Sequence, residues 1–351
     1  MRRIPNPDML ILAREARGYT LTNLAGAINV SVGLLSKIEH GIVHATDAHI
    51  NAIATELEFP VSLFYRPEHV RGTDSPCLHH RKRKTMPKLM LKRIEAQMHL
   101  AQLQVTRMLE DLDIEGALTL ATLDPDEYGG PQAVAQALRA LWRLPSGPIP
   151  NLVQVLEAAG AVVLLRDFGA GKLDGMSSWA GGPAVFYINS RIPTDRMRWT
   201  LAHELGHLVM HPQATSGDQE DEADQFALEF LAPEAELKHD LRSLTFARLP
   251  ALKMHWRISM IALVRAAGRF DAVPAPKLKS MYVQISRSGW RTKEPFELSP
   301  ESPTIIDKAM QVHLREHGYS QDELASVVDL RPDEFSKLYA PKEERPRLRA
   351  V

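Results

Sequence analysis

The pentapeptide His-Glu-Leu-Gly-His at residues 203–207 constrains this chain more than any other segment. In an α-helix, residues four positions apart lie on the same face, so His203 and His207 can direct ring nitrogens at one metal ion. Glu204 then stands beside the first ligand, where it can take a proton from metal-bound water. The motif therefore predicts a helix, which we place at residues 194–211, with a zinc site on one face. The alternative is an exposed helix face that happens to carry a histidine pair.

A second helix is expected to complete the metal site, because catalytic zinc has three protein ligands and one open position for water. We place this helix in the acidic segment at residues 218–231. Glu220 and Asp224 are four positions apart and share a face, which makes Glu220 the predicted third ligand and Asp224 the predicted hydrogen-bond partner of a ligand histidine. Glu222 points the opposite way and is the second choice for ligand. His211 is interpreted as a surface residue or as a partner of a ligand.

Two short strands are expected before the motif helix, at residues 161–166 and 184–189, since both are apolar runs. If strand 184–189 lies at the edge of its sheet, it can pair with an extended peptide; the alternative is an ordinary core strand. In the predicted reaction, zinc polarises the scissile carbonyl and Glu204 passes the proton of water to the leaving amine. Tyr187 and His211 are the candidate hydrogen-bond donors to the transition state.

The first segment, residues 7–67, is predicted to be all helical. Its apolar residues recur at helical spacing, and Thr20 and Ser31 are placed to cap two short helices that form a helix-turn-helix. In such a motif the second helix enters the DNA major groove with its first residues near the bases. The predicted DNA-contacting residues are Ser31, Val32, Gly33, Ser36 and Lys37.

Charge gives little support to DNA binding by this segment. Residues 1–66 hold six basic and six acidic side chains, so phosphate attraction is weak unless the basic run at residues 81–84 assists. Val32 and Gly33 lack hydrogen-bonding side chains, which leaves apolar contact with thymine methyl groups. The alternatives are a protein-binding or dimerisation module for the helical segment and a solvated linker for the basic run.

An internal repeat relates the two ends of the chain. The pattern Tyr-Thr-Leu-Thr-Asn-Leu-Ala at residues 19–25 recurs as Tyr-Ser-Gln-Asp-Glu-Leu-Ala at residues 319–325. Residues 35–38 and 335–338 correspond at the same spacing. The repeat predicts a second helix-turn-helix near the C-terminus. The alternative is a chance match between two amphipathic helix pairs.

Composition limits the class of protein. The 351 residues are 44% hydrophobic and 24% charged, as in a globular protein, and the net charge of −1 gives no overall attraction to nucleic acid or anionic lipid. Cys77 is the only cysteine, which excludes an intramolecular disulfide and a cysteine-based zinc finger. We find no signal peptide and no membrane-spanning apolar run, so we expect a cytoplasmic protein without a membrane partner.

We expect a mainly α-helical chain in which only the domain around the metal site is α+β. The N-terminal domain is expected to be all-α, and the last segment to be a helical extension with the second helix-turn-helix. A helix at about residues 89–112 is expected within the second segment. The expected divisions are residues 1–67 for the helix-turn-helix domain, 68–148 for a basic linker and helical segment, 149–240 for the metal-site domain and 241–351 for the extension.

Two known families resemble parts of this sequence, over residues 8–66 and 150–240. The XRE (Cro/C1-type) helix-turn-helix family is similar to Leu12-Ala-Arg-Glu-Ala-Arg-Gly-Tyr-Thr, Leu24-Ala and Leu35-Ser-Lys-Ile-Glu-His-Gly. The ImmA/IrrE metallopeptidase family resembles Asp174-Gly-Met-Ser-Ser-Trp, residues 196–207, Glu222-Ala-Asp-Gln-Phe-Ala and Leu231-Ala-Pro. The order resembles that of fused regulators in which an XRE domain precedes the peptidase.

The peptidase resemblance implies a zincin-like, gluzincin-type catalytic domain with a small sheet. Carried over by position, the zinc ligands of the family fall on His203, His207 and Glu220, and its general base falls on Glu204. Mn²⁺ is an alternative to Zn²⁺, and no organic cofactor is implied. Family members cleave helix-turn-helix repressors at a specific site, which relieves repression in stress responses or mobile-element induction.

The leading hypothesis is therefore a zinc metalloendopeptidase of the HExxH type coupled to a DNA-binding domain. Its implied partners are double-stranded DNA and a helix-turn-helix repressor as substrate, either a separate protein or one of its own kind, and a homodimer is left open. The sequence departs from the usual XRE pattern at Leu21 and Val32, which leaves operator specificity open. The alternative hypothesis is a DNA-binding transcriptional regulator whose metal site is structural or sensory, without proteolysis.

Overall fold

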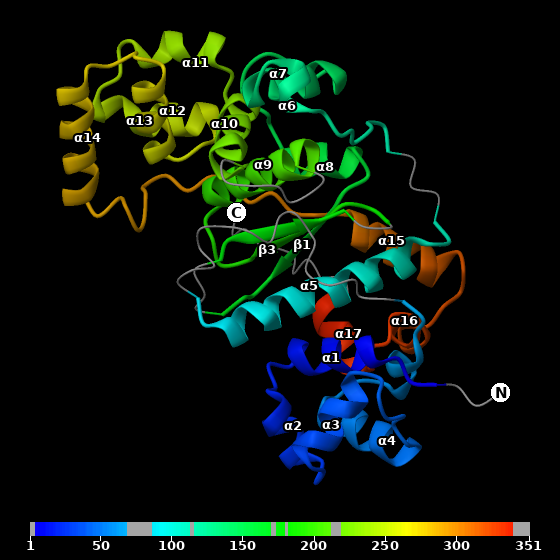
Figure 1. The fold of residues 1–351 in the computed structure, drawn as a ribbon. Helices are drawn as coiled ribbons and strands as arrows, with labels where there is room; N and C mark the ends of the chain where they lie inside the picture. Colours follow the sequence, from blue (N-terminus) through cyan, green and yellow to red (C-terminus); the bar gives the residue numbers. More distant parts are fainter. Residues whose placement is uncertain are drawn as a thin grey trace, which may run out of the picture. The chain divides into compact units, whose positions relative to one another are not determined.

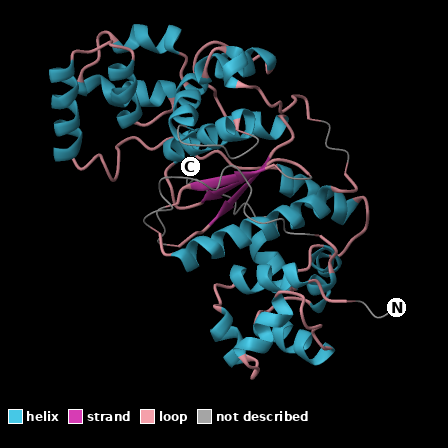
Figure 2. Cartoon of the chain, in the orientation of Figure 1, coloured by secondary structure: helices cyan, strands magenta, loops and turns pink. Residues whose placement is uncertain are grey.

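The computed structural model describes residues 4–68, 86–112, 116–169, 173–179, 182–211 and 219–339. Within these ranges the chain is mainly α-helical and has one small three-stranded sheet (Figure 1 and Figure 2). Two compact units are present, and the first combines both ends of the chain. It contains residues 1–72, 86–114 and 304–351, while the second contains residues 73–85 and 115–303. The basic run at residues 81–84 lies outside the described residues.

The first unit begins with a helix-turn-helix. Helices α2 (Leu21–Ala27) and α3 (Val32–Glu39) are joined by a turn in which Asn29 has a φ of 55°. Thr20 and Ser31 each accept a hydrogen bond from a backbone N–H of the following helical turn, which confirms both predicted N-caps. No single described helix is long and apolar enough to cross a membrane, although α2 and α3 pass that test together as a bent pair. The elements packed around this pair are α1 (Pro7–Ala16), α4 (Asp47–Glu56) and the 3₁₀ helix η1 (Val61–Tyr65).

The long helix α5 (Lys88–Leu109) connects this domain to the C-terminal helices of the same unit, because it packs against α1 and also against α15 and α16. Asp329, just after α16, is buried and accepts hydrogen bonds from Ser62 (2.6 Å), Arg66 (2.6 Å) and Arg107. One carboxylate thus fastens the C-terminal helices to the first domain and to α5. These helices are α15 (Ile305–Arg315), α16 (Gln321–Val327) and α17 (Pro332–Tyr339).

The two copies of the internal repeat have similar backbone structures. Helices α16 and α17 begin at residues 321 and 332, where α2 and α3 begin at residues 21 and 32. Asp329 has a φ of 53° in the turn, as Asn29 has 55°. The start of α17 is acidic, however, and its Glu334 pairs with Arg17 at 2.6 Å. The acidic first turn of α17 opposes an approach to DNA phosphates.

The second unit contains the sheet, whose strand order is β1-β3-β2. Strand β3 (Val185–Asn189) runs parallel to β1 (Val162–Arg166) and antiparallel to β2 (Gly175–Ser178). All five residues of β3 are buried, as is typical of a central strand. Of the two readings of strand 184–189, edge strand or ordinary core strand, the structure therefore has the core strand, and β2 is an edge strand that packs against the motif helix. The sequence Gly-Met-Ser-Ser has no apolar run, so β2 gave no strand signal.

The motif helix α9 (Thr194–Met210) packs on the sheet and on α10 (Gln219–Leu231). The two helices approach closely at Gly206, where a Cβ atom would lie 3.0 Å from Cδ1 of Phe226 on α10. Glycine at this position therefore lets α10 come near the two histidines. The remaining helices are α6 (Pro125–Tyr128), α7 (Pro131–Leu141), α8 (Leu152–Ala158), α11 (Glu234–Leu241), η4 (Phe246–Arg248), α12 (Leu249–Trp256), α13 (Met260–Arg269) and α14 (Ala275–Arg287).

A buried ion network fixes the motif helix within this unit. The guanidinium of Arg198 on α9 is fully buried and donates to Glu301, which also accepts from Arg257 at 3.2 Å. The second carboxylate oxygen of Glu301 accepts hydrogen bonds from two backbone N–H groups at the start of α8. Glu301 therefore both neutralises Arg198 and caps α8.

Replacing Glu301 with glutamine is expected to lower the free energy of unfolding by about 3–5 kcal/mol, because Arg198 is left buried without its counter-charge. Differential scanning calorimetry of the full chain measures the effect on the transition of this unit. Lys238→Gln, which removes an exposed ion pair with Glu234, is the control and should change stability by less than about 0.5 kcal/mol. Equal transition temperatures for both variants would contradict this role of Glu301.

Candidate metal centre

Three side chains from α9 and α10 converge on one point. The Nε2 atoms of His203 and His207 are 3.2 Å apart, and oxygens of Glu220 lie 3.8 Å from the first and 3.5 Å from the second. Atoms bound to a tetrahedral zinc ion at about 2.0–2.1 Å are about 3.3 Å from one another, so these spacings resemble the edges of such a site. The ligand atoms of the three residues all lie within 4.8 Å of one another. The cluster could therefore hold a metal ion, and its members are the three residues that the sequence selects.

The ring of His203 is oriented through its other nitrogen. Its Nδ1 lies 2.9 Å from Oδ1 of Asp224, the predicted partner, so an Nδ1–H donor places the lone pair of the ring on Nε2, the nitrogen that would bind a metal. Trp199 also donates a hydrogen bond to Asp224. Burial alone raises the pKa of Asp224, but the hydrogen bonds from His203 and Trp199 and the charge of His203 together lower it. Asp224 is thus an ionised acceptor.

The ring of His207 is oriented by a buried histidine. Its Nδ1 lies 3.1 Å from Nδ1 of His211, and Nε2 of His211 lies 2.7 Å from the carboxylate of Glu222. Burial lowers the pKa of His211, although Glu222 acts in the opposite direction. A neutral His211 that donates to Glu222 can accept the Nδ1–H of His207. His211 is therefore buried as the partner of a candidate ligand, and Glu222, the second choice for third ligand, binds His211 and lies outside the cluster.

Glu204, the predicted general base, is only 2% exposed and stands beside the cluster. The hydroxyl of Ser177 on β2 donates to Oε2 of Glu204 at 2.9 Å. This hydrogen bond fixes the direction of the carboxylate. Sequence reasoning missed Ser177, and its one signal is its place in the segment at residues 174–179 that resembles the metallopeptidase family.

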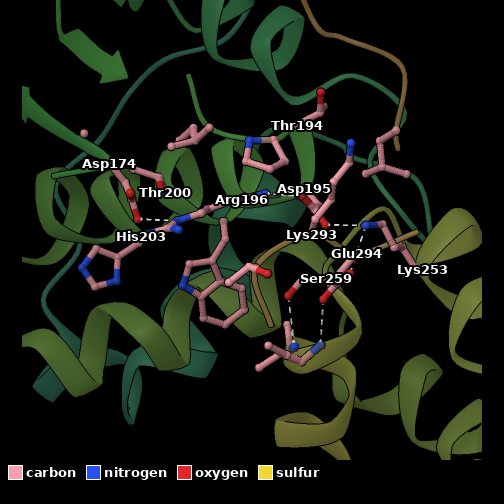
Figure 3. A pocket seen from close by; sticks show the side chains of 18 of the residues that line it. Asp174, Thr194, Asp195, Arg196, Thr200, His203, Lys253, Ser259, Lys293 and Glu294 are labelled. Atoms are coloured by element: carbon pink, nitrogen blue, oxygen red, sulfur yellow. Dashed lines mark hydrogen bonds and ion pairs between the residues drawn. The ribbon is translucent and has the colours of Figure 1, made fainter. Parts of the chain in front are cut away.

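The cluster opens into a cleft of about 880 Å³, which His203, Glu204, Glu220 and Asp224 help to line. Figure 3 shows this cleft with His203 at its side. Neither candidate donor to the transition state is among the described residues that line this cleft. Tyr187 instead stacks on a neighbouring aromatic ring of the same unit, with centroids 5.1 Å apart. His211 is held behind His207. A donor role for either residue stays a prediction, and their positions in the described structure give it no support.

The predicted DNA-contacting residues lie along α3 and at its N-cap. Most of them are exposed, and Ser36 is half-buried. The exposed apolar side chains Val32, Ile42 and Val43 lie on α3 and in the loop after it, and sequence reasoning did not single out the last two. DNA contact by these residues remains a prediction. The exposed predicted residues are Ser31, Val32, Gly33 and Lys37.

Comparison with known families assigns both domains. Residues 4–64 match the helix-turn-helix family model, and residues 156–267 match the peptidase M78 model, described as the IrrE N-terminal-like domain. No curated protein and no solved structure is similar enough to match. The second match begins in α8 and ends in α13, so it includes the sheet, the motif helix and α10. The chain therefore carries an XRE-type helix-turn-helix domain followed by an IrrE-like domain of the M78 peptidase family.

Proposed function

We propose that this chain is a zinc-dependent, site-specific endopeptidase coupled to a DNA-binding domain. The observation that carries the proposal is the convergence of His203, His207 and Glu220 beside the buried carboxylate of Glu204. Two imidazoles and one carboxylate form a donor set that suits a catalytic zinc ion with one open position. Mn²⁺ remains an alternative occupant.

The residues of this site have separate roles in peptide hydrolysis. Bound zinc would supply Lewis acidity toward the scissile carbonyl and the attacking water. Glu204 takes one proton from that water as its oxygen bonds to the carbonyl carbon, and returns the proton to the amide nitrogen as the C–N bond breaks. Ser177 holds Glu204 in the orientation for both transfers, while Asp224 and His211 hold the two imidazoles.

Strand β2 offers the substrate an edge near these groups. It pairs with β3 on one side and is the outer strand of the sheet, and the motif helix packs against it. An extended peptide that adds to this edge would run past Ser177 and Glu204, which are hydrogen-bonded to each other. An extended substrate would therefore pair with β2, because β3 is the central strand of the sheet.

A helix-turn-helix repressor is the proposed substrate, and relief of repression is the proposed outcome. Support comes from the fusion of a helix-turn-helix domain to an IrrE-like domain and from the resemblance to families that cleave such repressors. The test mixes the zinc-loaded chain with a panel of purified helix-turn-helix repressors, which includes the full-length Glu204→Gln form of this chain. Mass spectrometry should find one dominant cut in at least one repressor, blocked by a chelator. Intact proteins throughout the panel would count against a repressor substrate.

Asp224→Ala is expected to weaken zinc binding by about 10- to 100-fold, because His203 loses the acceptor that fixes its ring. Competition against a fluorescent zinc chelator measures the affinity. Asp221→Ala is a matched control, since Asp221 is an exposed acid on the same helix and bonds only Gln225 in the described structure. Equal zinc affinities for the two variants would contradict the proposal that Asp224 orients the ring of His203.

A further inference from the structure

The cleft extends beyond the metal cluster to α13 and to the segment at residues 290–300. Figure 3 shows His203 and Asp174 toward one side of this space and Lys253 and Ser259 toward the other. A peptide bound at the cluster would therefore place neighbouring side chains against this second wall. The charges on this wall therefore influence which substrate side chains bind there.

A buried ion network holds the second wall in position. The Lys253 ammonium binds Asp195 on the motif helix at 2.7 Å and Glu294 at 3.0 Å. Glu294 also accepts hydrogen bonds of 2.9 and 3.3 Å from two backbone N–H groups at the start of α13. The motif helix, α13 and the segment at residues 290–300 are thus fixed by shared polar contacts, and the charges of Lys253, Asp195 and Glu294 are satisfied internally.

Two arginines stand on these fixed elements and line the cleft. Arg265 lies four residues after Ile261 on α13, and both side chains line the same space, as helical spacing allows. Arg291 follows Trp290, whose ring stacks on Phe246 with centroids 4.7 Å apart. Both arginines are exposed to solvent. Their positions are set by the backbone and their guanidinium groups can reach a ligand in the cleft.

Within the part of the chain that the structure describes, the two arginines differ from the other cations of the cleft in having no acidic partner. Neither Arg265 nor Arg291 forms a hydrogen bond or an ion pair with any residue in the described ranges. The other lysine and arginine side chains that line the cleft are matched by carboxylates. Those pairs are Arg196 with Asp174 (2.8 Å), Arg191 with Asp167 (2.6 Å), Lys293 with Glu297 (3.9 Å) and Lys253 with Asp195 and Glu294.

We propose that Arg265 and Arg291 form a subsite for an aspartate or glutamate side chain of the peptide substrate, close to the bond that is cut. The inference rests on the proposed peptidase function and adds a substrate preference to it. Guanidinium groups bind carboxylates through paired hydrogen bonds, and an internal carboxylate partner is lacking here. Because both arginines are exposed, the peptide chain can continue past them, which fits a side chain within a longer substrate.

The test uses libraries of terminally blocked decapeptides in which one position is fixed as Glu, Gln or Lys and the others are randomised. Blocked ends remove terminal carboxylates, so only a side chain can fill the subsite. The zinc-loaded chain should cleave the Glu library about two- to fivefold faster than the Gln library at one position relative to the cut, as expected for solvent-exposed charge contacts. Binding of labelled Glu and Gln peptides to the Glu204→Gln chain, followed by fluorescence anisotropy, should show the same preference without turnover.

Charge reversal on the wall gives the decisive comparison. Arg265→Glu and Arg291→Glu should each abolish the preference for Glu over Gln and favour the Lys library, with zinc content unchanged. Arg269→Glu is the matched control, because Arg269 is exposed one turn later on α13 and does not line the cleft. If Arg265→Glu and Arg269→Glu shift selectivity equally, the subsite is refuted.

The outcomes also separate this inference from the proposed function. Cleavage of all libraries at equal rates would refute the subsite and leave the peptidase intact. Acid-selective binding without any cleavage would support the subsite and count against the peptidase. Equal binding of the Glu and Gln peptides to the Glu204→Gln chain would overturn the subsite whatever the turnover.

Discussion

Replacing Glu204 with glutamine is expected to reduce peptide hydrolysis by about 10²- to 10⁴-fold while bound zinc stays at the wild-type level. Glutamine has nearly the same shape, and its carbonyl can still accept the hydrogen bond from Ser177. It cannot take up a proton, however, and Glu204 is not one of the three clustered ligand candidates. The change therefore removes proton transfer and leaves metal binding in place.

Two measurements on the same preparation check this result: cleavage rates and zinc per chain by elemental analysis. Glu127→Gln, at an exposed position on α6, is the matched control and should retain full activity. The Glu204→Gln variant also distinguishes the two hypotheses drawn from the sequence, a peptidase and a regulator without proteolysis. A regulator whose metal site is only structural or sensory would keep its regulatory response when Glu204 is changed, whereas a regulator that acts by proteolysis would lose it.

Alanine at His203, His207 or Glu220 is expected to remove zinc and hydrolysis together. Each change leaves two of three protein ligands, and a chain that binds about one zinc ion should fall close to background after dialysis against a chelator. His239→Ala is the control, because the side chain of His239 is 87% exposed and distant in sequence from the motif. Unchanged zinc stoichiometry in any of the three variants would refute that residue as a ligand.

A further variant distinguishes ligands from their partners. Glu222→Ala removes the acceptor for His211 and leaves all three side chains of the cluster in the chain. It should therefore keep zinc at saturating metal and lose affinity, in contrast to Glu220→Ala, which should lose the metal outright. Two acids on one helix, two positions apart, thus give different results.

The arrangement of the metal cluster could be predicted because it depends on spacing within two helices. Positions four apart share a face, which brings His203 and His207 together and pairs Glu220 with Asp224. The partners that lie across the fold gave no comparable signal. Ser177 comes from a strand without an apolar run, and the bond from His211 to Glu222 depends on how α9 and α10 meet at Gly206.

At the two ends of the chain, too, the helices could be predicted from the sequence but the contacts between distant segments could not. The repeat predicted helices near residues 321–338, and helical spacing predicted a helix near residues 89–112, which the structure has at Lys88–Leu109. Helix α5 and the last three helices belong to the same unit as the first domain. This grouping depends on contacts between residues far apart in sequence, so helical spacing could not predict it. Asp329, with its bonds to Arg66 and Arg107, looks in the sequence like an ordinary turn residue.

Anomalous diffraction from crystals of the zinc-loaded chain, recorded on both sides of the zinc absorption edge, tests the central claim most directly. The proposal predicts one strong peak within about 2.2 Å of Nε2 of His203, Nε2 of His207 and a carboxylate oxygen of Glu220. It is contradicted if the peak is absent from this cluster, or if zinc binds there while the oxygens of Glu220 stay more than about 6 Å from both rings.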